Sequence, residues 1–194
     1  ARLLGYEIID QNNFVSPSLE KELNDELSVI NQKSIILPLG NVSITKKVKS
    51  LLIVLRMNTE VEIWDQSKKR LFEQPKIDYS IRSINSLLKS IVDCRNKYPF
   101  IKIKTIIVDD QSKKVNLDRI RKLIQDQNVK IISLDHEKYK SIIKKQKTTE
   151  TFSNLASLLQ SFEIGKNQGE DLIFFIEDDY IHSKTMIDEM ITSY

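Results

Sequence analysis

From residue 50 onward, short runs rich in apolar residues alternate with longer segments in which apolar and polar residues are mixed. The apolar runs cover residues 51–55, 103–108, 129–134 and 172–176. The first run is apolar throughout, which is typical of a strand buried on both faces of a sheet. In the mixed segments, apolar residues recur at helical spacing, which predicts helices over residues 78–95, 117–124, 151–164 and 183–190. Residues 165–169, which begin and end with glycine, are expected to end the third helix.

The regular alternation of strands and helices predicts an α/β fold with a Rossmann-like doubly wound, mainly parallel sheet. Right-handed crossovers then place helices on both faces of the sheet. We expect the first strand to lie between the second and the fourth. Residues 1–48 have a different sequence pattern, which consists of two short apolar runs and an acidic stretch. We interpret them as an N-terminal appendage or the end of a preceding domain, and residues 49–194 as the α/β domain.

The charge balance excludes some classes of partner. The 194 residues carry 30 basic and 27 acidic side chains, and the lysine pairs are scattered, so no concentrated basic face for nucleic acid is expected. Cys94 is the single cysteine, which fits a reducing compartment. The apolar runs are far shorter than a bilayer requires. We therefore expect a cytoplasmic protein, and peripheral association with the inner face of a membrane stays open.

Two acidic groups directly follow apolar runs. Asp109 and Asp110 follow the second run, and Glu177, Asp178 and Asp179 follow the fourth. In an open parallel sheet, ligands bind beyond the carboxyl ends of the strands, where the strand order reverses. Adjacent carboxylates repel each other unless a cation lies between them, and their oxygens suit Mg²⁺ or Mn²⁺. Such an ion can bridge a diphosphate. The alternative is that these acids cap the following helices or face water.

The residues around both acidic groups resemble segments of family 2-type glycosyltransferases with the GT-A fold. Residues 106–112 read IIVDDQS, close to the family's IVDDGS, and residues 172–179 read LIFFIEDD, similar to a strand with its DXD-type motif. A helix that contains Asn154 and a following turn, Gly169-Glu170, also match the family pattern, as does the segment over residues 83–88. The resemblance covers residues 50–194. The sequence departs from it at Gln111, where the family has glycine.

The resemblance implies a site for a nucleotide-sugar donor, with UDP the first candidate for the nucleotide, and a divalent cation, Mn²⁺ or Mg²⁺. Metal ligation falls to Asp179 with Asp178. The residues implied in donor binding are Arg56, Asp109, Asp110, Asn154, Glu177 and Asp178. Within this set Asp109 contacts the nucleoside and Asp110 supports the turn, whereas Arg56 contacts a phosphate or makes a structural ion pair. The acceptor, whether glycan, lipid or protein, is not specified, and the general base is expected after Tyr194, so the chain is interpreted as an incomplete domain.

Two other functions compete with the glycosyltransferase interpretation. A receiver-like regulatory domain also has an Asp-Asp pair after a strand, but there the pair ends the first strand, and a lysine follows a fifth strand. A nucleotide-sugar-binding module without catalysis would keep the same site, and metal-dependent cleavage of a nucleotide sugar would distinguish it from an enzyme. The two histidines, His136 and His182, are interpreted as surface residues.

Overall fold

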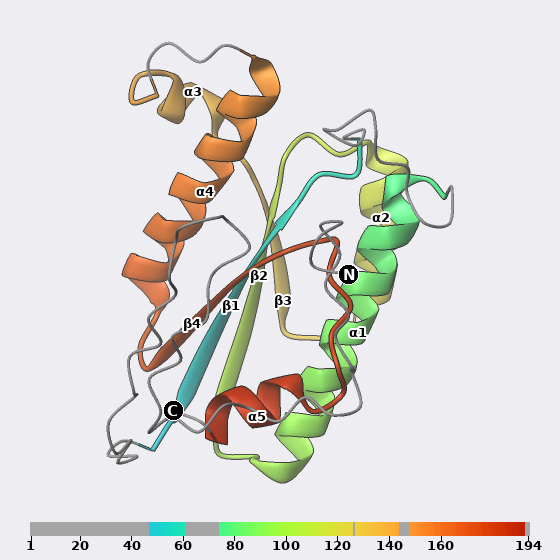
Figure 1. Ribbon diagram of the computed structural model, residues 1–194, viewed down its shortest axis with the longest axis vertical. Helices are drawn as coiled ribbons and strands as arrows, with labels where there is room; N and C mark the ends of the chain where they lie inside the picture. Colours follow the sequence, from blue (N-terminus) through green and yellow to red (C-terminus); the bar gives the residue numbers. More distant parts are fainter. Residues whose placement is uncertain (1–46, 61–73, 126, 144–147, 193–194) are drawn as a thin grey trace, which may run out of the picture. The chain divides into compact units, whose positions relative to one another are not determined.

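Four parallel strands form the central sheet of the computed structural model (Figure 1). They are β1 (Ser50–Met57), β2 (Lys102–Asp109), β3 (Val129–Ser133) and β4 (Leu172–Glu177). Their order is β3-β2-β1-β4, so all four predicted strands are confirmed and the first lies between the second and the fourth. The structure describes residues 47–60, 74–125, 127–143 and 148–192. The predicted appendage lies outside these residues, except for its last two positions.

Helices cover both faces of the sheet, as the crossover rule requires (Figure 1). The described helices are α1 (Lys76–Lys97), α2 (Lys114–Ile124), α3 (His136–Lys140), α4 (Thr149–Gln168) and α5 (Met186–Thr192). Helices α1, α2 and α5 pack on one face, whereas α3 and α4 pack on the other. This arrangement confirms the Rossmann-like doubly wound α/β fold. The short helix α3 was not predicted, because five residues are too few to show a helical period.

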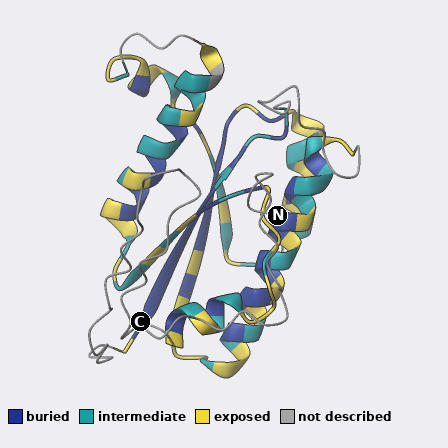
Figure 2. Ribbon diagram, viewed as in Figure 1, coloured by how far each residue is buried: buried dark blue, intermediate teal, exposed yellow. Residues whose placement is uncertain are grey.

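Residues 51–55 of strand β1 are all apolar because this part of the strand contributes to both layers of the core. Side chains alternate across a strand, so Leu51, Ile53 and Leu55 pack against the α1 face while Leu52 and Val54 pack against the α4 face. Figure 2 shows β1 buried along almost its whole length. A central strand of this kind has no solvent-facing side, which explains the absence of polar alternation in its sequence.

The predicted end of the third helix at residues 165–169 is wrong at its first residue. Helix α4 continues through Gly165 and ends at Gln168, with Gly169 after it. A Cβ atom on Gly165 would lie 2.7 Å from the Cζ atom of Phe175. Gly165 therefore allows α4 to approach β4 closely and does not end the helix, although glycine inside a helix is locally unfavourable.

The strand order also locates the point at which ligands bind in such sheets. From β1 the chain first builds outward through β2 and β3, and it then returns to add β4 on the other side of β1. The reversal makes the β1–β4 boundary the topological switch point. Receiver domains have the order 2-1-3-4-5, so the observed order does not support the receiver-like alternative.

Within the described residues, no helix is both long and apolar enough to cross a membrane.

Candidate functional site

The two acidic groups lie on either side of the carboxyl end of β1. In the strand register Met57 is opposite Asp109, and Arg56 is opposite Glu177. Neighbouring strands in a sheet are about 4.8 Å apart, so the ends of β2 and β4 are separated by roughly 10 Å. The register therefore brings the two acidic groups to the same edge of the sheet.

Asp109 ends β2 as a buried carboxyl group with incomplete hydrogen bonding. The residue is 3% exposed. Its Oδ2 atom accepts a hydrogen bond of 3.3 Å from the backbone N–H of Ser112, while its buried Oδ1 atom has no partner among the described residues. Burial raises the pKa of Asp109 above its ordinary value, and the hydrogen bonds from Ser112 oppose that shift. One buried oxygen is therefore left without a hydrogen-bond donor among the described residues.

Asp110 connects three strand ends through hydrogen bonds. Its backbone N–H donates to the carbonyl of Met57 at 2.9 Å, and its carboxylate accepts from the side-chain amide of Asn58 at 3.3 Å. The Nε2 atom of His136 lies 2.7 Å from Asp110 Oδ1, and the His136 ring packs beside Phe152. The interpretation of His136 as a surface residue is therefore wrong, since it is largely buried at the start of α3. These contacts connect Asp110 to the loop after β1 and to the start of α3.

The turn after β2 has the conformation that the family's glycine would favour. Gln111 has a φ of 57°, in the left-handed region that glycine adopts more readily than other residues. The loop after β1 holds this turn from the side. The backbone N–H of Thr59 donates to Ser112 Oγ at 3.1 Å, and Glu60 forms an ion pair of 2.6 Å with Lys113. Hydrogen bonds with Lys113 lower the pKa of Glu60 to about 2.

Arg56 contacts two other residues implied in donor binding, Glu177 and Asn154, at the switch point. Arg56 on β1 forms an ion pair with Glu177 on β4. Its Nη1 atom also donates to Asn154 Oδ1 at 2.7 Å and to Ser157 Oγ at 3.3 Å on α4. The sequence left Arg56 open between a phosphate ligand and a structural ion pair, and the structure shows the ion pair.

The acids of the turn after β4 differ sharply in exposure. Asp178 is buried on the α1 face, where its carboxylate accepts hydrogen bonds from Lys76 Nζ at 2.8 Å and from Ser80 Oγ. The side chains of Lys76 and Asp178 are only 14% and 7% exposed. Burial raises the pKa of Asp178, and the Lys76 charge and both hydrogen bonds oppose that shift. Asp179 is exposed to solvent.

The described residues fit a divalent cation in only one manner. They contain no group of three or more His, Cys, Asp or Glu side chains placed to hold an ion. Mg²⁺, however, is commonly bound through one or two carboxylates, substrate phosphates and water, without a complete protein cage. Asp179 is the acid that suits this mode, because it is exposed, whereas Asp178 and the 45% exposed Glu177 are each paired with a basic side chain.

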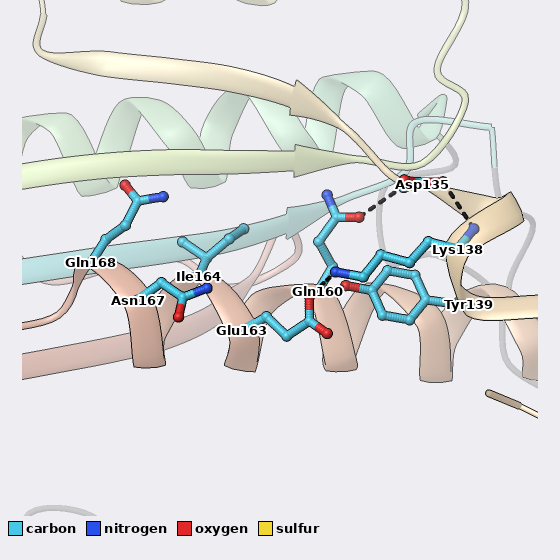
Figure 3. Close-up of a pocket in the computed structure, with 8 residues that line it drawn as sticks. All are labelled: Asp135, Lys138, Tyr139, Gln160, Glu163, Ile164, Asn167 and Gln168. Carbon is cyan, nitrogen blue, oxygen red and sulfur yellow. Dashed lines mark hydrogen bonds and ion pairs between the residues drawn. The ribbon is translucent and has the colours of Figure 1, made fainter. Parts of the chain in front are cut away.

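A cavity of about 270 Å³ lies between α3 and α4, and no acid of either turn lines it (Figure 3). Its lining consists of Asp135, Lys138, Tyr139, Gln160, Glu163, Ile164, Asn167 and Gln168. Many of its polar groups bond to one another or to nearby backbone. Glu163 accepts hydrogen bonds from Lys138 and Tyr139, and Gln160 bonds to the backbone of Asp135. The cavity is therefore a gap between helices α3 and α4 that is lined largely by hydrogen-bonded polar side chains.

Sequence reasoning found the acids and Arg56 but missed Lys76 and the serines of α1 that hold Asp178 and the segment after it. Ser80, Ser83 and Ser90 are buried on the core face of α1, and small polar residues on an otherwise apolar helix face are the signal that could have indicated a polar segment packed there. His182 is also partly buried, and burial lowers its pKa, so its interpretation as a surface residue is wrong.

Comparisons with family models, curated proteins and solved structures find no match to this chain.

Proposed function

We propose that this chain binds a nucleotide-sugar donor in the crevice at the carboxyl ends of β1, β2 and β4, and that it acts in glycosyl transfer. The observation that supports this proposal is the strand order, which places an acidic turn on each side of the β1 end, at the topological switch point. The sequence resemblance supplies the reaction class, and UDP is the nucleotide proposed.

The two turns take different parts of the donor. The β2 turn faces the nucleoside, where the unpaired Oδ1 atom of Asp109 is an acceptor that the described residues leave unused. The β4 turn faces the diphosphate and the sugar. Asp179 would hold Mn²⁺ or Mg²⁺, which supplies positive charge to the leaving diphosphate. Arg56 orients Glu177 beside that turn.

The reaction requires cleavage of one bond and formation of another. The bond between the anomeric carbon and the diphosphate oxygen breaks, and its electron pair leaves with the nucleoside diphosphate. The acceptor hydroxyl forms the new glycosidic bond and gives its proton to a general base. A module without catalysis would bind the donor with the same metal dependence and would release no nucleoside diphosphate, so product release distinguishes the two.

Calorimetry of UDP binding tests the proposal. UDP should bind the full chain at least about tenfold more tightly with Mn²⁺ than with EDTA, a difference of about 1.4 kcal/mol, because a carboxylate-lined crevice repels a free diphosphate. Equal affinity under both conditions would count against the proposal.

Two matched variants separate the proposed roles. Asp179→Asn should abolish the Mn²⁺ dependence without lowering the melting temperature, because Asp179 is exposed. Asp109→Asn should weaken UDP binding but keep the Mn²⁺ dependence, because its proposed contact is with the nucleoside. If Asp179→Asn binds UDP with unchanged metal dependence, the role given to Asp179 is wrong.

A further inference from the structure

Residues 178–187, which we call the β4–α5 segment, run beside helix α1 from the end of β4 to the start of α5 (Figure 1). Three serine hydroxyls of α1 bond to this segment. The bonds join Ser80 to the Asp178 carboxylate, Ser86 to the backbone N–H of His182 at 3.0 Å, and Ser90 to the backbone N–H of Ile187 at 3.0 Å. The segment is therefore attached to α1 at both ends and near its middle.

His182, at the middle attachment, has a buried ring atom without a hydrogen-bond partner. Its Nε2 atom finds no donor or acceptor in the part of the chain that the structure describes, and its ring packs edge to face against Phe174 of β4, with the ring centroids 6.5 Å apart. The hydroxyl of Ser83, between Ser80 and Ser86 on α1, is also buried without a described partner. Buried polar atoms without bonds destabilise the packed state, so the segment is held weakly at this point.

The charged groups that join α1 to the segment and to α5 are already paired with one another. The pairs are Lys76 with Asp178, Lys184 with Asp93, and Lys97 with Asp188. Of the other charged groups on the packed elements, Glu177 of β4 pairs with Arg56, and Asp179 and Arg82 are exposed. Burial lowers the pKa of His182 below its ordinary value of 6.5, and no neighbouring charge opposes that shift.

We propose that His182 makes the β4–α5 segment sensitive to pH, so that the segment stays packed on α1 at neutral pH and detaches reversibly in mild acid. This inference rests on the packing of the segment and not on the proposed function. Because the segment begins with Asp178, its detachment also loosens the acidic turn after β4.

Protonation favours the detached state because only that state solvates the charged ring. In the packed segment a proton on the ring would add a buried charge without a counter-charge. In the detached segment the ring takes up a proton near its ordinary pKa of 6.5. The packed state is therefore fully favoured above pH 6.5 and loses stability as the pH falls below it. About one pH unit below that value, the equilibrium constant for detachment should be roughly five to ten times larger.

Amide hydrogen exchange of the full chain, followed by NMR and corrected for intrinsic exchange rates, tests the inference. The protection factors of the backbone N–H groups of His182 and Ile187 should fall roughly five- to tenfold between about pH 7.5 and about pH 5.5. His182→Phe keeps an aromatic ring beside Phe174 but cannot take up a proton, so residues 182 and 187 should be equally protected at both pH values. If His182→Phe does not fold, His182→Asn provides the same test with a smaller neutral side chain.

Two control variants separate titration of His182 from other effects. The chain has two histidines, so His136→Gln leaves His182 as the only one and should keep the wild-type pH dependence. Ser86→Ala removes the bond to the His182 N–H and should lower protection by the same factor at both pH values. Equal protection of the wild-type segment at both pH values would overturn the inference. An equal loss in the neutral His182 variants would also overturn it, as would an equal loss in the amides of β1, which report unfolding of the whole sheet.

Discussion

The acidic turns after β2 and β4 have the same pattern in the sequence but are stabilised differently. The β2 turn buries both of its aspartates, Asp109 and Asp110, whereas the β4 turn buries Asp178. Asp178 has a lysine and a serine as partners, contributed by α1. Asp109 has only hydrogen bonds from Ser112, within its own turn, and one oxygen has no partner. A carboxylate position after a strand therefore does not by itself indicate whether the acid binds a ligand or anchors the turn.

The two turns also differ in which neighbouring elements contact them. The β2 turn is held from the side by the loop after β1, through Thr59 and Glu60, and from α3 by His136. The β4 turn is held from both faces of the sheet, since α1 binds Asp178 and α4 binds Arg56, which pairs with Glu177. The β4 turn therefore has side-chain partners on both faces of the sheet, whereas the β2 turn keeps a buried carboxylate oxygen without a partner among the described residues.

The largest effect is expected when the buried pair at the β4 turn is broken. Asp178→Asn leaves Lys76 buried without its counter-charge, so the free energy of unfolding should fall by about 3 kcal/mol. Asp109→Asn has no counter-charge to expose and should lower it by less than about 1 kcal/mol. Urea denaturation of both variants at pH 7 measures the difference. Equal losses would remove the distinction between the two turns.

The pH dependence of stability should distinguish Asp109 from an ordinary acid. Its pKa in the folded state is raised above 3.8 by burial, so the folded state holds the proton more tightly than the unfolded chain. The stabilising contribution is complete below pH 3.8 and is lost as the pH rises through the raised pKa. Asp109→Asn removes the titrating carboxyl group and with it this loss of stability. The free energy of unfolding of the variant, relative to that of wild type, should therefore increase as the pH rises. A constant difference between the two proteins across this range would contradict the raised pKa.

Glu60 should show the opposite dependence with a smaller amplitude. Its pKa is lowered from 4.5 to about 2, so its contribution is present above pH 4.5 and is lost as the pH falls toward 2. The side chain is 28% exposed, and solvent screening should limit the effect of Glu60→Gln to about 0.5 kcal/mol. Urea denaturation at pH 7 and at low pH measures it, and wild type and variant should converge in acid. A variant that is equally stable at pH 7 would show that the contacts of Glu60 do not hold the β2 turn.

The smallest effect is expected at Gln111, the non-glycine residue with positive φ among those described. Gln111→Gly relieves a left-handed conformation that is unfavourable by about 1 kcal/mol for other residues. Glycine also increases the conformational entropy of the unfolded chain, which destabilises the folded state by a similar free energy. The melting temperature should therefore change by no more than about 3 °C. A clear destabilisation would mean that the Gln111 side chain contributes contacts of its own.

The sequence by itself determined the strands, most of the helices, the doubly wound fold class and the placement of acids at strand ends. Those features depend on local periodicity and on chain order, which can be seen in a single sequence. Tertiary structure decided the partners of the acids. Lys76 meets Asp178 across 102 positions of sequence, and Arg56 meets Glu177 across 121. Such pairs follow from strand order, register and the face on which each helix packs, and these depend on the closure of the whole core, which no local pattern records.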